Sequence, residues 1–225
     1  AGDFNADGRP DAVVSAFGAS GLAVLLNIGF GFSNSTFYPT TFLPRSLALG
    51  DLNGDGRLDA VDPNFKQYNT VSVLLGNGTG GFGAANHFAA GTQPIAVAVR
   101  DVTGNGSLDV ITANNGAGTI SVLAGLGNGA LSAPSHVSVG ASPTPVLAAD
   151  LDGDFVVDIA ATSGSGNSIA FLKGTGGGAF LTPRSMGTGT SPQSLVCSDL
   201  NGDGRPDLVT TNTGGADQTA SLLLN

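Results

Sequence analysis

Five short clusters of aspartate are the part of this 225-residue sequence with the clearest chemistry. All 17 acidic residues are Asp, and fifteen of them fall in these clusters. Acidic residues kept for solubility would include Glu and would be spread along the chain. Because the acidic residues are all Asp and nearly all lie in the clusters, we infer that the geometry of each cluster requires a short acidic side chain.

Each cluster has oxygen-bearing side chains at its positions 1, 3, 5 and 9, whereas the side chain at position 7 varies. A varying side chain is what a main-chain carbonyl ligand at position 7 would produce. We number the clusters as loops one to five. Their candidate ligands are Asp3, Asn5, Asp7, Arg9 and Asp11; Asp51, Asn53, Asp55, Arg57 and Asp59; Asp101, Thr103, Asn105, Ser107 and Asp109; Asp150, Asp152, Asp154, Val156 and Asp158; Asp199, Asn201, Asp203, Arg205 and Asp207.

This ligand set favours Ca²⁺, with up to five ions in a structural role. All the ligands are hard oxygens, and no His or Cys lies within the loops, which disfavours zinc and copper. Glycine at position 6 of four loops permits the sharp turn that wraps a cation. An EF-hand is rejected, because no loop has Glu at position 12 and no helical period follows.

Loops three and four depart from the pattern. Loop three has Thr103 and Asn105 at positions 3 and 5, carries less charge, and is predicted to be the weakest site. Loop four has four carboxylates but Phe155 in place of the usual glycine. Ordinary Asx turns without a metal remain the alternative, more so for these two loops than for the others.

The loops begin 48, 50, 49 and 49 residues apart, so the chain is a repeat array. Each unit has about four short runs rich in Val, Ile, Leu and Thr, bounded by Gly, Asn and Pro, which predicts strands. Four strands in nearly 50 residues favour one blade of a β-propeller, with a β-helix or β-sandwich array as the alternative. The predicted repeats are approximately 1–43, 44–93, 94–142, 143–191 and 192–225, in a single propeller or propeller segment.

The sequence around loop two resembles the FG-GAP/VCBS repeat family. Loop two lies within residues 50–59, with the Gly81-Phe82 pair later in the unit. Phe32 and Phe180 hold comparable places, and Leu131 substitutes in the third unit. The resemblance implies an all-β propeller whose Ca²⁺ loops join the first and second strands of each blade. Five repeats are recognisable and the terminal blades are incomplete, so closure is expected to need a longer chain or another subunit.

Composition disfavours several other classes. A net charge of −9 with 8 basic residues disfavours nucleic-acid binding, and one cysteine excludes a disulfide scaffold. No apolar run is long enough for a membrane-spanning helix. His87 and His136 lie in different units and at different phases, so no catalytic pair is evident and the chain is not expected to be an enzyme. Phe65 and Tyr68, in a polar insertion, are the most plausible exposed ligand contacts.

The sequence thus predicts a secreted or cell-surface binding or adhesion module for a glycan or protein ligand, stabilised by calcium. One alternative is a structural repeat segment of a larger surface protein or assembly. A second is the non-catalytic part of a polysaccharide-degrading enzyme.

Overall fold

The computed structural model describes residues 1–41, 43–66, 68–214 and 218–225. Within these residues the regular structure consists of strands, without a helix. The described chain accordingly contains no helix able to span a membrane. The strands are β1 (Ala12–Ala16), β2 (Gly21–Leu25), β3 (Thr36–Pro39), β4 (Ala48–Gly50), β5 (Asp59–Asn64), β6 (Thr70–Leu74), β7 (Asn86–Ala89), β8 (Pro94–Arg100), β9 (Asp109–Asn114), β10 (Thr119–Leu123), β11 (Ser135–Ser138), β12 (Pro143–Ala149), β13 (Asp158–Ser163), β14 (Ser168–Leu172), β15 (Gly174–Gly176), β16 (Ala179–Phe180), β17 (Arg184–Gly187), β18 (Val196–Ser198), β19 (Asp207–Asn212) and β20 (Thr219–Leu223).

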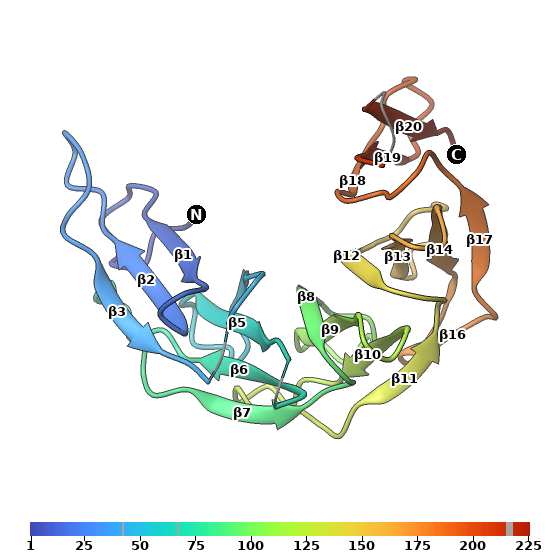
Figure 1. Ribbon diagram of the computed structural model, residues 1–225. Helices are drawn as coiled ribbons and strands as arrows, with labels where there is room; N and C mark the ends of the chain where they lie inside the picture. The colour runs from blue at the N-terminus through green and yellow to red at the C-terminus, as the bar shows by residue number, and fades with distance from the viewer. Residues whose placement is uncertain (42, 67, 215–217) are drawn as a thin grey trace.

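Apart from the two-stranded sheet β15-β16, the strands of the described residues form five antiparallel sheets, which we number in chain order. Sheet one is β1-β2-β3, sheet two is β4-β5-β6-β7, and sheet three is β8-β9-β10-β11. Sheet four is β12-β13-β14-β17, with the small hairpin β15-β16 inserted before its last strand, and sheet five is β18-β19-β20. The sheets stand side by side along an arc whose two ends, sheets one and five, do not meet (Figure 1).

The predicted four-stranded unit is confirmed in sheets two, three and four. Sheets one and five have three strands each: sheet one begins at the strand that follows its loop, and sheet five ends at its third strand. In sheets two to five the Asp loop joins the first strand to the second, and its position-9 aspartate opens the second strand. The loops therefore occupy equivalent places in successive sheets.

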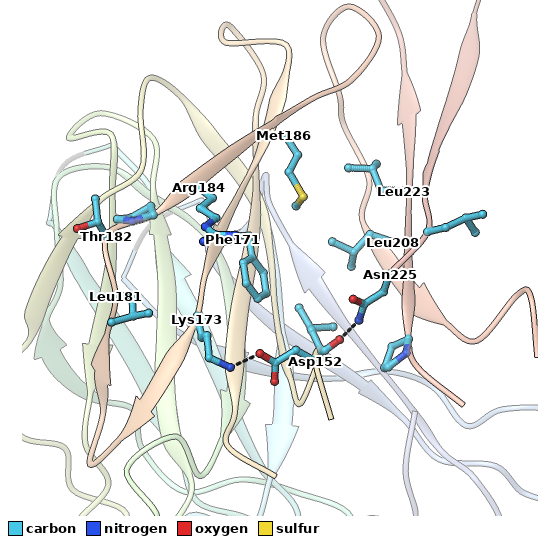
Figure 2. A pocket seen from close by; sticks show the side chains of 14 residues that line it. Asp152, Phe171, Lys173, Leu181, Thr182, Arg184, Met186, Leu208, Leu223 and Asn225 are labelled. Atoms are coloured by element: carbon cyan, nitrogen blue, oxygen red, sulfur yellow. Dashed lines mark hydrogen bonds and ion pairs between the residues drawn. The ribbon is translucent and has the colours of Figure 1, made fainter. Parts of the chain in front are cut away.

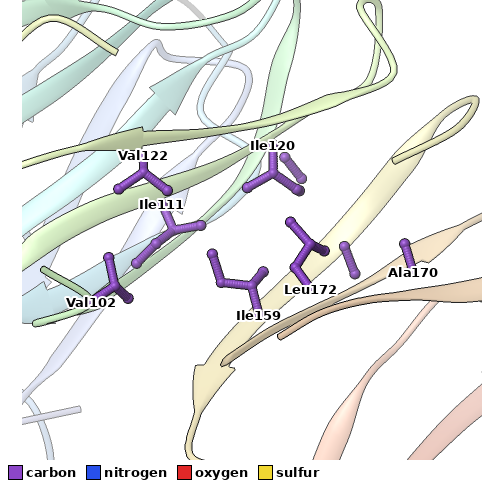
Figure 3. Packing of buried hydrophobic residues seen from close by; sticks show 9 residues of the cluster. Val102, Ile111, Ile120, Val122, Ile159, Ala170 and Leu172 are labelled. Carbon is purple, nitrogen blue, oxygen red and sulfur yellow. The ribbon is translucent and has the colours of Figure 1, made fainter. Parts of the chain in front are cut away.

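The core lies between the sheets. Every residue of β5, β9 and β13 is buried, because these strands are covered on both faces by neighbouring sheets. Separate apolar clusters fill the spaces between successive sheets. Figure 3 shows the one in which Ile111 and Ile120 of sheet three face Ile159 and Leu172 of sheet four. Each such buried side chain stabilises the stack by about 1.5–3 kcal/mol.

Candidate metal-binding loops

The aspartate at position 1 organises each loop through the backbone. In loop two, Asp51 Oδ1 accepts hydrogen bonds from the N–H groups of Gly54 (2.7 Å) and Asp55 (3.1 Å), and Oδ2 accepts one from Gly56 (2.8 Å). Gly54 and Gly56 have φ values of 74° and 80°, a conformation that glycine adopts without strain. Loops three, four and five repeat this wrapping around Asp101, Asp150 and Asp199.

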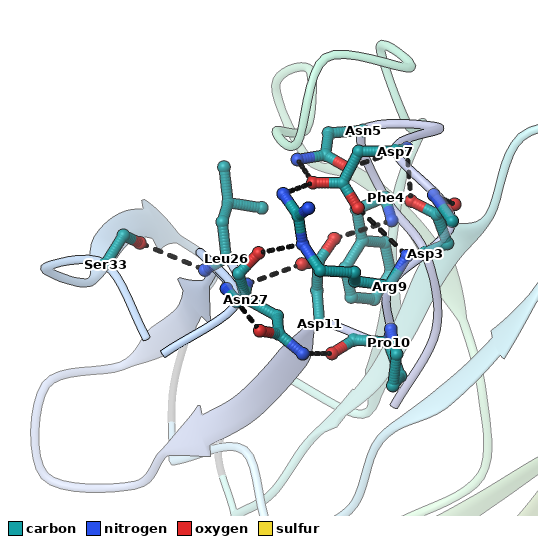
Figure 4. A network of polar contacts seen from close by, with 12 residues as sticks. Asp3, Phe4, Asn5, Asp7, Arg9, Pro10, Asp11, Leu26, Asn27 and Ser33 are labelled. Carbon is teal, nitrogen blue, oxygen red and sulfur yellow. Dashed lines mark hydrogen bonds and ion pairs between the residues drawn. The ribbon is translucent and has the colours of Figure 1, made fainter. Parts of the chain in front are cut away.

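Positions 3 and 5 continue the loop as nested Asx turns. Asn53 Oδ1 accepts the Asp55 N–H at 3.1 Å, and Asp55 Oδ1 accepts the Arg57 N–H at 2.9 Å. Loop one has the same arrangement, in which Asn5, Asp7 and Arg9 follow one another around the turn (Figure 4). The Asx turns that the sequence offered as an alternative are therefore present. They are compatible with a metal site, because they gather the oxygens of positions 1, 3 and 5.

The aspartate at position 9 has a structural role that the sequence reading missed. Asp59 is fully buried; its Oδ2 accepts the Leu52 N–H and its Oδ1 accepts the Gly76 N–H, both at 2.8 Å. One carboxylate thus ties the loop to the end of the third strand. We call these residues the clamp aspartates: Asp11, Asp59, Asp109, Asp158 and Asp207. Burial raises the pKa of Asp59 and of Asp158.

The donor set of the loops fits calcium. In loop four, ligand oxygens of Asp150, Asp152 and Asp158 all lie within 4.8 Å of one another. Oxygens bound to one Ca²⁺ at 2.3–2.6 Å can lie about 5 Å apart at most, so one ion could reach all three. Among the described residues no other loop gathers three acidic groups this closely. In those loops position 3 is Asn or Thr, whose side-chain oxygen is neutral.

A lysine side chain lies against the carboxylates of loop four. The Lys173 ammonium group contacts the carboxylates of Asp152 and Asp154, the latter at 2.8 Å. Hydrogen bonding to Lys173 lowers the pKa of Asp154, and the same contacts raise the pKa of Lys173. Lys173 directly precedes Gly174, at the place that Leu75 holds in sheet two. The loop with an additional carboxylate is therefore the loop with an additional ammonium group.

Loops one and two place an arginine beside their position-5 aspartate instead. Arg9 lies 2.6 Å from Asp7, and Arg57 lies 3.9 Å from Asp55. In loop five, hydrogen bonding from the Arg205 N–H lowers the pKa of Asp203. Hydrogen bonds and charge from neighbouring donors favour the ionised form of the Asp203 carboxylate.

The backbone of loop four is strained at position 6. Phe155 has a φ of 65° and is 95% exposed, whereas the equivalent Gly56 has a φ of 80°. A side chain in this left-handed region costs about 1–2 kcal/mol. The turn nevertheless keeps its shape at this residue despite the Phe.

The aromatic residues proposed as ligand contacts are not both exposed. Phe65 is 8% exposed, and the Arg45 guanidinium lies 4.5 Å from the centre of its ring. The expectation of an exposed Phe65 is therefore wrong, because a cation–π contact and packing cover it. Tyr68 is 51% exposed, so a ligand role there stays a prediction.

The two histidines hold equivalent places, which corrects the expectation of different phases. His87 and His136 are the second residues of β7 and β11. Their Nδ1 atoms lie 3.1 Å from the Ser72 hydroxyl and 2.9 Å from the Ser121 hydroxyl, respectively. The sequence did not reveal this match, because the number of residues between the Asp loop and the outer strand differs by one between sheets two and three.

Asp62 is a buried carboxylate outside the loops. It lies on β5 and is fully buried, with the hydroxyl groups of Thr40 and Ser72 as neighbouring donors. Burial raises its pKa to about 6. The equivalent residue in sheet four is Ala161, so this group is not part of the repeated design.

Comparison with known proteins identifies the family. The FG-GAP-like repeat model matches residues 3–61, 101–161 and 150–210, which is more than half of the chain. The chain belongs to the FG-GAP-like repeat family. None of the curated proteins compared with the chain matches it.

Several solved structures share the fold at low sequence identity. A Photorhabdus luminescens Tc holotoxin pore is 21% identical over 98% of this chain, with a TM-score of 0.53. An Agrocybe aegerita lectin, described as recognising non-reducing terminal N-acetylglucosamine, is 22% identical over 99%, with a TM-score of 0.61. A streptogramin B lyase is 17% identical over 95%, with a TM-score of 0.64. The chain spans 11%, 65% and 64% of the lengths of these proteins, respectively.

Proposed function

We propose that this chain is part of a calcium-stabilised β-propeller that acts outside the cell as a binding module for a glycan or a protein. The observation that carries the proposal is the recurrence of one oxygen-lined loop at the same place in successive sheets. Calcium at the loops would neutralise carboxylates that otherwise repel one another, and would stabilise the fold by mass action. Extracellular calcium is concentrated enough to fill weak sites.

Binding is favoured over catalysis by the roles the acidic groups already have. The clamp aspartates are engaged by backbone N–H groups, and the other loop carboxylates hold the Asx turns. The lectin and the toxin among the solved structures are consistent with a module for ligand or assembly binding. Fold likeness alone selects neither ligand, so the ligand must be sought experimentally.

Calcium titration by calorimetry, with a matched pair of variants, tests the metal part of the proposal. Asp55→Asn keeps the oxygen that accepts the Arg57 N–H but removes a charge, and it should weaken loop two. Asn105→Asp makes the opposite change in loop three, where Asn105 accepts the Ser107 N–H at 2.7 Å. It should strengthen that loop, the predicted weakest. A folded chain that takes up no calcium would rule the calcium role out.

A glycan array, run in millimolar calcium and again in EDTA, tests the ligand part. Calcium-dependent binding to a defined sugar would make the chain a lectin. Absence of binding in calcium, with the fold verified by circular dichroism, would exclude the glycans tested and leave a protein ligand or a structural segment.

A further inference from the structure

An arginine supported by two aromatic rings lies where sheets one and two meet. Arg45 precedes β4, and its guanidinium carbon lies 5.1 Å from the centre of the Phe17 ring and 4.5 Å from that of the Phe65 ring. Phe17 and Phe65 directly follow β1 and β5, so the two rings come from neighbouring sheets. Cation–π contacts with both rings favour one position of the guanidinium. We call Arg45, Phe17 and Phe65 the arginine–aromatic cluster.

The arginine–aromatic cluster lies at the opposite end of sheet two from its Asp loop. β5 runs from the clamp aspartate Asp59 to Asn64, so Phe65 lies about 20 Å from the loop end of the sheet. Lys66 adds a second positive charge here, because its ammonium group lies 5.9 Å from the centre of the Phe65 ring. Asp62, on the same strand, is fully buried. The cluster therefore presents positive charge on a chain whose net charge is −9.

Arg45 differs from the basic residues beside the Asp loops in having no anionic partner. Arg9 lies 2.6 Å from Asp7, and Lys173 contacts Asp152 (Figure 2). In the part of the chain that the structure describes, the Arg45 side chain makes no ion pair and no hydrogen bond. Its N–H donors are therefore available to a ligand.

The arginine–aromatic cluster is not part of the repeated design. Arg45 directly follows Pro44, and the residues that follow the equivalent prolines are Ile95, Thr144 and Gln193. The places of Phe17 and Phe65 are held in sheets three, four and five by Asn115, Gly164 and Thr213. Because the later sheets pack without arginine or phenylalanine at these places, the fold does not require the cluster.

A surface hollow adjoins the arginine. It has a volume of about 400 Å³ and is lined by Ser15, Phe17, Pro44 and Arg45. Small-molecule sites have volumes of roughly 300–1,000 Å³, so the hollow is large enough for a small ligand group. Phe17 is 43% exposed, which leaves part of its ring free to contact a ligand. The hollow thus combines an apolar wall with an unpartnered guanidinium.

We propose that this hollow binds a uronate unit of an acidic glycan. The carboxylate of the sugar accepts two parallel hydrogen bonds from the planar guanidinium of Arg45. The apolar face of the sugar ring packs on Phe17 and Pro44, and Lys66 adds attraction for the negative charge. A hollow lined by four residues suits one sugar unit better than an extended acidic peptide. This inference rests on the binding role proposed above and names the chemical class of the glycan.

A fluorescently labelled tetramer of galacturonate is the direct probe, with its methyl ester as the uncharged counterpart. Fluorescence anisotropy should show saturable binding of the acid to the full chain in millimolar calcium. The ester should bind about tenfold or more weakly, because it cannot form the charge-assisted pair of hydrogen bonds.

Three protein variants locate the site. Arg45→Gln should weaken binding by about tenfold or more, since it removes the guanidinium. Arg45→Lys keeps the charge but not the planar donor pair, and should weaken binding about fivefold. Arg184→Gln makes the same change in charge on β17, beside the cleft between sheets four and five (Figure 2), and should bind like the unchanged protein. Circular dichroism verifies that all three are folded.

Equal binding of the acid and the ester, or absence of binding, would overturn the proposal. An Arg45→Gln variant that binds like the unchanged protein would place the uronate elsewhere, for example on calcium at the Asp loops, and would also overturn it. Unchanged binding by Arg45→Lys would show recognition of charge alone and would contradict the paired hydrogen bonds.

A tetra-aspartate peptide serves as the competitor of equal charge. Displacement of the galacturonate tetramer by this peptide at equal concentration would assign the hollow to an acidic peptide and overturn the glycan proposal. None of these outcomes alters calcium uptake by the loops or binding of other glycans on the array. The calcium titration and the array therefore separate failure of this inference from failure of the proposed function.

Discussion

Sheets two and four share one backbone plan but balance their charges differently. Loop two has Asn53 at position 3 and relies on Arg57 beside the loop, whereas loop four has Asp152 at position 3. The additional negative charge of Asp152 is matched by Lys173, which lies 21 residues later in the sequence. The comparison shows that the clamp aspartate fixes the geometry of the loop in both sheets. The number of loop carboxylates differs between the sheets, together with the basic side chain, Arg57 or Lys173, that lies beside them.

Removal of the clamp should have the largest effect and should be equal in both sheets. Asp59→Asn places an amide NH₂ where a carboxylate oxygen now accepts a buried N–H. Loss of that charge-assisted bond and the resulting unpaired donors should cost roughly 3–5 kcal/mol. Asp158→Asn should cost the same within about 1 kcal/mol, because Asp158 accepts the equivalent N–H groups of Leu151 and Gly174 at 3.0 and 2.8 Å.

Urea unfolding at fixed calcium, followed by circular dichroism, measures both losses. If only one of the two variants were destabilised, the clamp would not be a common element of the sheets. Unfolding must be monitored with more than one probe, since repeat arrays can lose cooperativity.

Asp62 should make the stability of sheet two depend on pH. Its pKa is raised from 3.8 to about 6 by burial, so the folded chain binds the proton more tightly than the unfolded chain. Stability is therefore greatest below pH 3.8, falls as the pH rises to about 6, and then levels off with respect to this group. Asp62→Thr should remove this dependence and add about 2–3 kcal/mol at pH 7.

Melting curves between pH 4 and pH 8 check this expectation, with Ala161→Thr in sheet four as the matched control. The control replaces the equivalent residue, which does not titrate, and should leave the pH profile unchanged. A profile for Asp62→Thr that parallels the unchanged protein would show that Asp62 does not ionise in this range.

Lys173 should compete with calcium at loop four. Lys173→Leu restores the residue type found at Leu75 and releases Asp152 and Asp154 for a cation. We expect the calcium affinity of loop four to rise about tenfold. In the absence of calcium the variant should be less stable, because four carboxylates then lack their ammonium partner.

Terbium luminescence and calorimetric titration report the change, with Lys66→Leu as a control for loss of one positive charge elsewhere. An affinity that falls in Lys173→Leu would mean that the lysine supports metal binding instead of opposing it.

Phe155→Gly should have the smallest effect. It relieves a left-handed non-glycine residue and should stabilise the loop by about 1 kcal/mol or less. The reverse change, Gly56→Phe in loop two, should destabilise by a similar amount, since Gly56 has a φ of 80°. Thermal melts of the pair check the prediction. A loss of stability in Phe155→Gly would mean that the exposed ring makes a contact that matters for the fold.

The fold could be predicted from the sequence because its determinants are local and repeated. The spacing of the Asp clusters, the strand-like runs and the Gly turns indicated the four-stranded units of sheets two to four, with the loop between the first two strands. The clamp was missed because its partners, such as Gly76, lie at the far end of the third strand. The role of Lys173 was missed and the exposure of Phe65 was misjudged for the same reason. Both depend on contacts with residues that are distant in the sequence.

Leu52 makes a main-chain hydrogen bond in each of two directions. Its N–H donates to Asp59 of its own sheet, and its carbonyl accepts the N–H of Gly129 from the next sheet. Every junction between inner sheets uses this same pair of bonds. A unit of about 49 residues can therefore be duplicated or deleted without the creation of a new kind of contact. The length of such an array is open to change by simple gene duplication, while each unit stays free to acquire its own loop charges.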